Sequence, residues 1–112
     1  TKQAEENCSV MAANQLKDFL ENGNIKNSVN FPELVESRKS KYRITVSNKN
    51  VAGMIGQITT VLADNNLNII EMINKSRDDI AYNVIDLDSK ASEKVISDLS
   101  ALNDVISVRG IS

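Results

Sequence analysis

The sequence predicts an α+β domain with the ferredoxin-like order β-α-β-β-α-β, preceded by a helix. Short apolar–polar alternations predict strands, and helix-length segments carry apolar residues three or four positions apart. Turn-forming residues separate these segments. Four strands and two helices in this order form an antiparallel sheet with both helices on one face. The other face, or a sheet edge, is then expected to stay available for a partner.

The preceding helix is predicted over residues 4–21, where apolar side chains recur at the helical period. Gly23 predicts its end, because glycine adopts the left-handed conformation at low cost. The apolar stripe of this helix needs a partner. It is expected to pair with a second copy, to fold back on the sheet, or to fray.

A polar connector is predicted over residues 24–40, extended where Phe31 precedes Pro32. Its charged second half resembles a linker between two structural units. The predicted organisation is therefore a helix and linker over 1–40, followed by the sheet domain over 41–112.

The sheet domain is predicted from the change to short strands that alternate with helices. Residues 77–79 predict a turn, so the second and third strands are expected to form an antiparallel hairpin. The expected elements are a strand over 42–47, a helix over 53–64, strands over 67–75 and 80–87, a helix capped by Ser92, and a strand over 105–110.

Composition and charge exclude several classes of partner. The net charge is -2 and no basic run is present, so no nucleic-acid partner is expected. The apolar runs are too short to cross a membrane. Cys8 is the single cysteine and cannot form an internal disulfide, and no signal-peptide pattern opens the chain. A cytoplasmic location is therefore expected.

The chain also lacks the residues of common catalytic sites. It contains no histidine, which excludes histidine acid–base chemistry and histidine metal sites. Cys8 has no histidine partner and lies on the apolar stripe of the predicted helix, so a buried structural thiol is expected. No glycine-rich phosphate-binding motif occurs. Neither catalysis nor a cofactor is expected within this chain.

The segment between the first strand and the first helix of the sheet domain is the candidate binding site. Gly53 allows a tight turn at a helix N-terminus, where free N–H groups attract a carboxylate. Asn48 and Asn50 add amides that donate and accept hydrogen bonds. Asn68, at the start of the second strand, is expected at the same end of the sheet. The plainer interpretation is that these asparagines only form turns and caps.

A short motif lies within residues 43–87. Its residues are Asn50, Gly53, Ile55, Ile58, Leu62, Leu67, Asn68 and Ile69. This pattern resembles the ACT domain, a small ligand-sensing module attached to many enzymes of amino-acid metabolism. The resemblance implies that such domains pair side by side into one continuous sheet.

The residues before the sheet domain carry a second resemblance. Its segments are Ala4-Glu5-Glu6-Asn7 through Ala12, Leu16 to Phe19, Asn22-Gly23 and Val29-Asn30-Phe31-Pro32. They are similar to the end of the catalytic part of the D-3-phosphoglycerate dehydrogenase family. The resemblance implies a fragment of a serine-biosynthetic enzyme whose catalytic residues and NAD site lie outside this chain.

The two resemblances together imply feedback regulation. L-Serine, or another small amino acid, is expected to bind between two copies of the domain in a homodimer formed through sheet edges. The effector-binding residues predicted are Asn48, Asn50, Val51, Ala52, Gly53 and Asn68.

Two alternatives remain open. The first is a structural oligomerisation module without a ligand, and two positions are in its favour: Asn48 and Ala52 stand where the family often has His and Pro. The second is a small independent enzyme, which the absence of a nucleophile–base pair disfavours.

Overall fold

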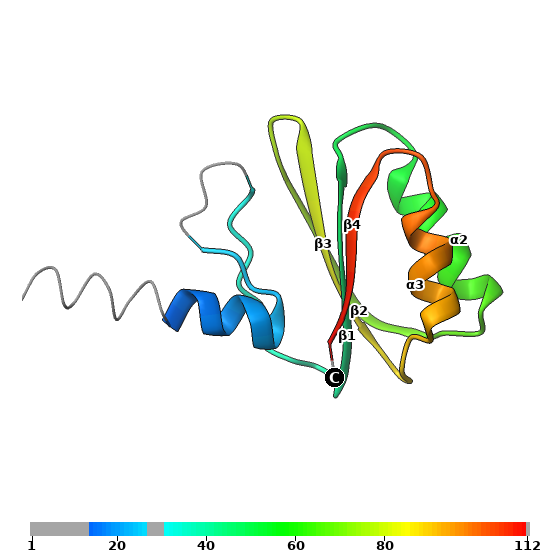
Figure 1. Ribbon diagram of the computed structural model, residues 1–112, viewed down its shortest axis with the longest axis horizontal. Helices are drawn as coiled ribbons and strands as arrows, with labels where there is room; N and C mark the ends of the chain where they lie inside the picture. Colours follow the sequence, from blue (N-terminus) through cyan, green and yellow to red (C-terminus); the bar gives the residue numbers. More distant parts are fainter. Residues whose placement is uncertain (1–13, 27–30, 112) are drawn as a thin grey trace, which may run out of the picture.

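The four strands form one antiparallel sheet with the spatial order β2-β3-β1-β4 (Figure 1). The computed structural model describes residues 14–26 and 31–111. The ferredoxin-like order predicted from the sequence is confirmed. The elements are β1 (Tyr42–Lys49), α2 (Met54–Asp64), β2 (Ile69–Arg77), β3 (Ile80–Leu87), α3 (Glu93–Ser100) and β4 (Val105–Ile111).

Both helices of the sheet domain cover the same face, and the aliphatic core lies beneath them. Alternate residues of β1 and β3 point into this core, as the two-residue strand period requires. Full burial of one such side chain stabilises the fold by about 1.5–3 kcal/mol. The core residues are Ile44, Val46, Ile58, Leu62, Ile85, Leu87, Val95 and Leu99.

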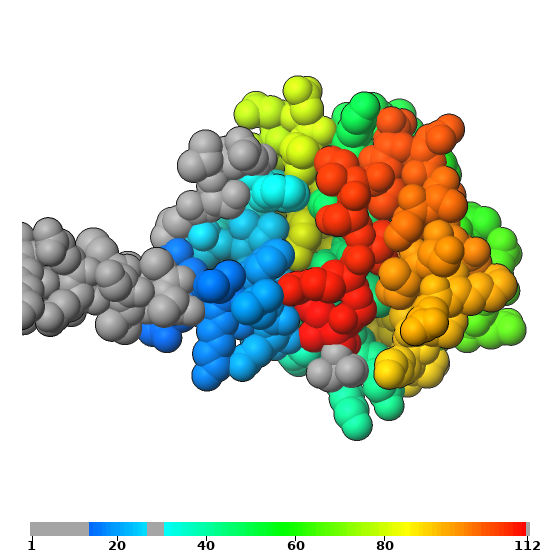
Figure 2. Space-filling view, viewed as in Figure 1, coloured from blue at the N-terminus to red at the C-terminus, as the bar shows by residue number. Residues whose placement is uncertain are grey.

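The opposite face of the sheet is covered as well, so the predicted availability of this face is wrong. Residues 14–22 are helical and end before Gly23, whose φ is +73°. This helix and the connector pack on the face away from α2 and α3 (Figures 1 and 2). The helix therefore folds back on the sheet, one of the three outcomes considered for it.

The connector covers this face with apolar side chains, although its charged residues led to the prediction of a linker. Ile25 and Leu34 form an antiparallel bridge, with backbone N···O distances of 2.7 and 2.8 Å. Leu34 is buried and packs with Tyr82 and Val84 of β3. The Phe31 ring meets Tyr82 edge to face, with 6.3 Å between centroids. The segment predicted as a linker is thus part of a second, smaller core.

A buried ion pair fixes the connector to the sheet. Arg43 and Asp86 face each other on β1 and β3. Arg43 also donates to the carbonyl oxygens of Asn22, Glu36 and Ser37 at 2.9–3.0 Å. The Arg43 guanidinium therefore holds the end of the first helix and the connector against the sheet.

Strand order also determines which edges can pair. The strand β1 is central, between β3 and β4, so its backbone groups are already used. Two copies of the domain therefore cannot extend the sheet by pairing their β1 strands. The edges of the sheet are β2 and β4.

Two sequence predictions lie outside the described residues: the first part of the helix with Cys8, and the extended Val29-Asn30 segment. In the part of the chain that is described, no helix is both long enough and apolar enough to span a membrane. The boundary after residue 40 stays a prediction.

Candidate functional site

The loop between β1 and α2 forms one wall of a pocket of about 230 Å³. Five of the six predicted effector-binding residues line it, and Asn68 does not. The lining residues are Asn48, Asn50, Val51, Ala52, Gly53, Met54, Ile55, Gly56, Asn74 and Ala81.

The N-terminus of α2 opens into this pocket. Gly53 is the N-cap residue, with φ +86°, a left-handed conformation that favours glycine. No side chain caps this terminus and its first turn contains no acidic residue. The first N–H groups of a helix lack intrahelical acceptors, and this end of the helix carries partial positive charge. The pocket therefore offers donors suited to a carboxylate.

Hydrogen bonds to the backbone carbonyls of two turns hold the loop in place. The Asn50 backbone N–H donates to the Asp79 carbonyl at 2.8 Å, and Asn50 Nδ2 donates to the Asp78 carbonyl at 3.1 Å. The Lys49 N–H donates to the Asp104 carbonyl at 2.8 Å. The loop that precedes α2 is thus tied to the β2–β3 hairpin turn and to the turn before β4.

Three asparagines form a hydrogen-bonded row over β2, β3 and β1, and the two ends of the row, Asn74 and Asn48, line the pocket. Asn74 Nδ2 donates to Asn83 Oδ1 at 2.6 Å, and Asn83 Nδ2 donates to Asn48 Oδ1 at 2.8 Å. Asn48 Nδ2 donates to the Lys49 carbonyl at 2.8 Å. Asn83 is 0% exposed and Asn48 is 1% exposed. The row fixes the orientation of the Asn48 amide.

Sequence reasoning missed Asn74 and Asn83. The signal was present, because an amide in the middle of an apolar strand needs buried partners. Asn83 lies between Tyr82 and Val84, and it occupies the helix-covered face opposite Val46.

Asn68 lies at the other end of the sheet within one chain, so the expectation that it shares an end with the loop is wrong. The strands β1 and β2 both run antiparallel to β3, so they run parallel to each other. The start of β2 is therefore far from the end of β1. Asn68 instead contacts the segment after β3, where its N–H donates to Asp88 Oδ1 at 3.2 Å.

Metal coordination finds no support in the described residues, where no group of three His, Cys, Asp or Glu side chains is placed to hold an ion. The pocket holds amides and backbone donors instead of a catalytic pair.

The βαββαβ order and the glycine turn before the first helix of the sheet are compatible with an ACT domain. The family model described as "ACT domain" matches residues 42–104, and the chain belongs to this family.

The curated relatives are all D-3-phosphoglycerate dehydrogenases. The protein from Dictyostelium discoideum is 28% identical over 110 residues, which are 97% of this chain and 26% of that protein. The protein from Escherichia coli strain K12 is 26% identical over 111 residues, which are 97% of this chain and 27% of that protein. The chain thus spans about a quarter of the length of these relatives and aligns with their C-terminal portion.

A solved structure shares the fold. The ACT domain from the GTP pyrophosphokinase of Chlorobium tepidum superposes with a TM-score of 0.55 at 20% sequence identity. The match covers 62% of this chain and 95% of that domain.

Proposed function

We propose that this chain is the amino-acid-binding regulatory module of a D-3-phosphoglycerate dehydrogenase and that L-serine is its effector. The observation that carries the proposal is the uncapped N-terminus of α2 opening into a small amide-lined pocket. The dehydrogenase names of the relatives support the choice of enzyme. The sequence has no glycine-rich turn for a dinucleotide, so NAD would bind a part of the enzyme outside this chain.

The chemistry of the pocket suits a small zwitterion. The carboxylate of the amino acid would accept hydrogen bonds from the N–H groups at the start of α2. Its ammonium group needs acceptors, which asparagine side-chain oxygens and loop carbonyls provide. A volume of about 230 Å³ suits an amino acid with a short side chain.

A second protomer would complete the site through the β2 edge. If two β2 strands pair antiparallel around a two-fold axis, the start of the partner's β2 lies beside the end of this one. That end reaches the β2–β3 turn, to which Asn50 is bonded. The pairing would bring the partner's Asn68 to the loop. Three half-exposed apolar side chains near the loop and this edge favour coverage by a partner: Val51, Ile55 and Ile70.

Regulation would work through a shift between two arrangements of the paired domains. Such coupling between sites is typically worth about 1–3 kcal/mol and is reciprocal. The strand β1 carries the loop at its C-terminal end and Arg43 near its N-terminal end. Because Arg43 holds the connector, a change in domain pairing would reach the preceding part of the chain through this strand.

A structural oligomerisation module is the second candidate, and the asparagine row favours it. Asn48 uses its oxygen for Asn83 and donates to the Lys49 carbonyl. Asn50 Nδ2 binds the Asp78 carbonyl. In this function the same amides would only stabilise the loop.

Calorimetric titration of the chain with L-serine, D-serine, glycine and L-alanine separates the two candidates. Saturable binding of L-serine, with D-serine weaker, supports the regulatory function. A chain that sediments as a dimer and binds none of the four supports the structural one. A chain that stays monomeric at tens of micromolar contradicts both.

A further inference from the structure

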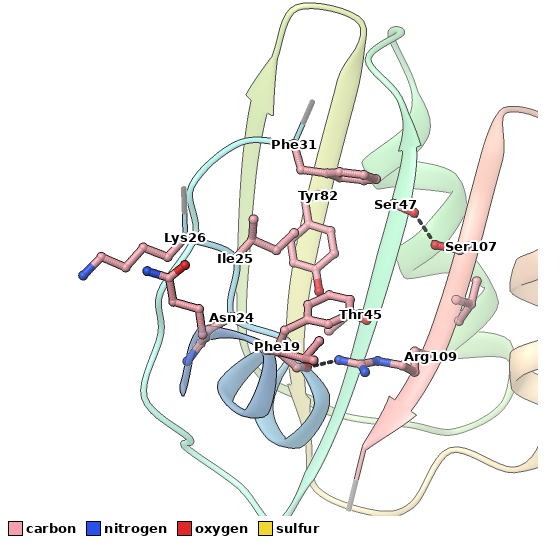
Figure 3. Close-up of a pocket in the computed structure, with 13 residues that line it drawn as sticks. Phe19, Asn24, Ile25, Lys26, Phe31, Thr45, Ser47, Tyr82, Ser107 and Arg109 are labelled. Atoms are coloured by element: carbon pink, nitrogen blue, oxygen red, sulfur yellow. Dashed lines mark hydrogen bonds between the residues drawn. The ribbon is translucent and has the colours of Figure 1, made fainter. Parts of the chain in front are cut away.

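A second and larger cavity lies on the other side of the sheet, beneath the helix of residues 14–22 (Figure 3). Its volume is about 530 Å³, within the range of small-molecule sites. The helices α2 and α3 cover the opposite face, so this cavity is separate from the pocket at α2. Its lining residues are Gln15, Leu16, Phe19, Asn24, Ile25, Lys26, Phe31, Thr45, Ser47, Tyr82, Ser107, Val108 and Arg109.

The body of the cavity is apolar and aromatic. The rings of Phe19, Phe31 and Tyr82 come from the helix, the connector and β3, and Figure 3 shows them along one side of the site. The Phe31 and Tyr82 rings stand at 80° to each other. Ile25 and Val108 add aliphatic surface. Such a lining favours an apolar chain or ring.

Arg109 is the charged group that faces the rings, while the exposed Lys26 side chain points away from them in Figure 3. No Asp or Glu occurs among the described lining residues. The Arg109 guanidinium lies 4.3 Å from the Phe19 ring centroid and donates from Nη2 to the Phe19 carbonyl. Its Nε is buried and has no hydrogen-bond acceptor within residues 14–26 and 31–111. A carboxylate would supply the missing acceptor and balance the charge.

From the unpaired Arg109 donor and the aromatic lining, we infer that this cavity binds a monocarboxylate with an apolar ring or short alkyl chain. The carboxylate pairs with Arg109, and the apolar part lies among the three rings. Inorganic phosphate is a poor fit because it offers nothing for the apolar lining. The site is independent of the proposed amino-acid effector and lies next to the connector, so its ligand stabilises the packing of the first helix on the sheet.

The test uses 3-phenylpropionate as the probe and the uncharged 3-phenylpropanamide as its matched control. Both are titrated into the ¹⁵N-labelled 112-residue chain and followed by amide NMR shifts. The acid is expected to give saturable shifts at Thr45, Ser107 and Arg109. The amide is expected to bind at least about tenfold more weakly than the acid, because it lacks the charge that strengthens a hydrogen bond to Arg109.

Two variants test the site by different routes. Arg109→Met removes the charge, and Ser107→Phe fills the cavity without changing any charge. Arg109→Met is expected to weaken binding of the acid at least about tenfold, the scale of one lost charge-assisted hydrogen bond. Ser107→Phe is expected to weaken it as well, because the added ring occupies the space of the apolar part of the ligand. Lys94→Met makes the same charge change on the opposite face of the domain and is expected to leave binding unchanged.

Three results would overturn the inference: no binding of the acid at millimolar concentration, equal binding of acid and amide, or unchanged binding by both cavity variants. L-Serine separates this site from the proposed effector site. If serine displaces the probe and the shifts cluster at residues 48–56, the probe occupies the pocket at α2 and this inference fails. If serine does not bind at all, the proposed function fails and this inference stands.

Discussion

Arg43 and Asp86 form a fully buried ion pair, in which the Arg43 Nε lies 2.7 Å from Asp86 Oδ1. The second bond of the pair joins Arg43 Nη2 to Asp86 Oδ2 at 3.0 Å. Asp86 Oδ2 also accepts from the Lys39 backbone N–H at 3.0 Å. This pair therefore connects the two central strands and the connector at one point.

Removing the charge of one partner in this ion pair should strongly lower the free energy of unfolding. Asp86→Asn keeps the side-chain shape but leaves the buried Arg43 charge uncompensated, which costs about 3–5 kcal/mol of unfolding free energy. Urea unfolding followed by circular dichroism measures the loss. The double variant Arg43→Met/Asp86→Leu should recover part of it, because no charge is then left buried. A single variant as stable as wild type contradicts the anchoring role.

The pair also predicts an acid-dependent stability. Burial alone would raise the pKa of Asp86, but hydrogen bonds from Arg43 and Lys39 and the Arg43 charge outweigh it and hold this pKa below its ordinary value. The unfolded carboxyl titrates near a pKa of about 3.9. Because the folded pKa is lower, the stabilisation is fully present above about pH 5 and is lost as the pH falls through the folded pKa.

Unfolding free energies measured in urea between pH 2.5 and pH 7 check this dependence. Asp86→Asn is expected to reduce the loss of unfolding free energy at low pH, because the titrating carboxyl group is gone. An unchanged pH slope in the variant would assign the acid sensitivity to other carboxyl groups.

Strand and helix positions were predictable because local patterns determine them. The strand over 80–87 was predicted to the residue, since a turn precedes it and apolar residues fill it. The covered second face was missed because Arg43, Thr45 and Ser47 alternate with apolar residues as a solvent-facing row does. Burial of this row depends on contacts with residues 14–40, which no local pattern reveals.

The candidate site was predictable in part for the same reason. The loop residues are contiguous in sequence, and a glycine before a helix indicates an uncapped terminus. The position of Asn68 depends on strand direction across the whole sheet, and the partners of Asn83 depend on register between three strands. Neither follows from a segment considered alone.

The buried asparagine row should support both stability and ligand binding. Asn83→Leu keeps the number and branching of the side-chain heavy atoms but leaves Asn48 Oδ1 and Asn74 Nδ2 without their partner. The loss of unfolding free energy should be about 1–3 kcal/mol, the cost of unpaired buried polar groups. Serine affinity should fall as well, because the Asn48 amide is no longer oriented. Asn74→Ala removes only the exposed end of the row and should have a smaller effect on stability, because water can then reach Asn83 Oδ1.

A charge added at the loop should block an anionic ligand. Asn50→Asp places a carboxylate beside the N-terminus of α2, where it competes with the carboxylate of the amino acid. Serine binding by calorimetry should be lost while circular dichroism stays unchanged. Asn14→Asp makes the same charge change at an exposed position of the helix of residues 14–22, on the other face of the sheet, and should bind serine as wild type does. If the Asn50 variant binds serine with the affinity of wild type, the serine site lies elsewhere in the chain.

Mixing two defective chains tests whether the amino-acid site is shared between protomers. Asn50→Asp damages the loop, and Asn68→Ala removes the amide that the proposed partner contributes from the start of its β2. Each homodimer then carries two damaged sites. A heterodimer of the two variants carries one site with both defects and one intact site, because the loop and Asn68 of each site come from different chains.

After unfolding and refolding the mixture together, serine binding should reappear in about a quarter of all sites, since half of randomly paired dimers are heterodimers with one intact site of two. Each variant refolded alone is the control and should show no recovery. A site built from one chain alone predicts instead that Asn68→Ala refolded alone binds serine as wild type does, because within one chain Asn68 lies at the other end of the sheet from the loop. The distance between Asn68 and the loop along the sheet is the structural reason to expect recovery.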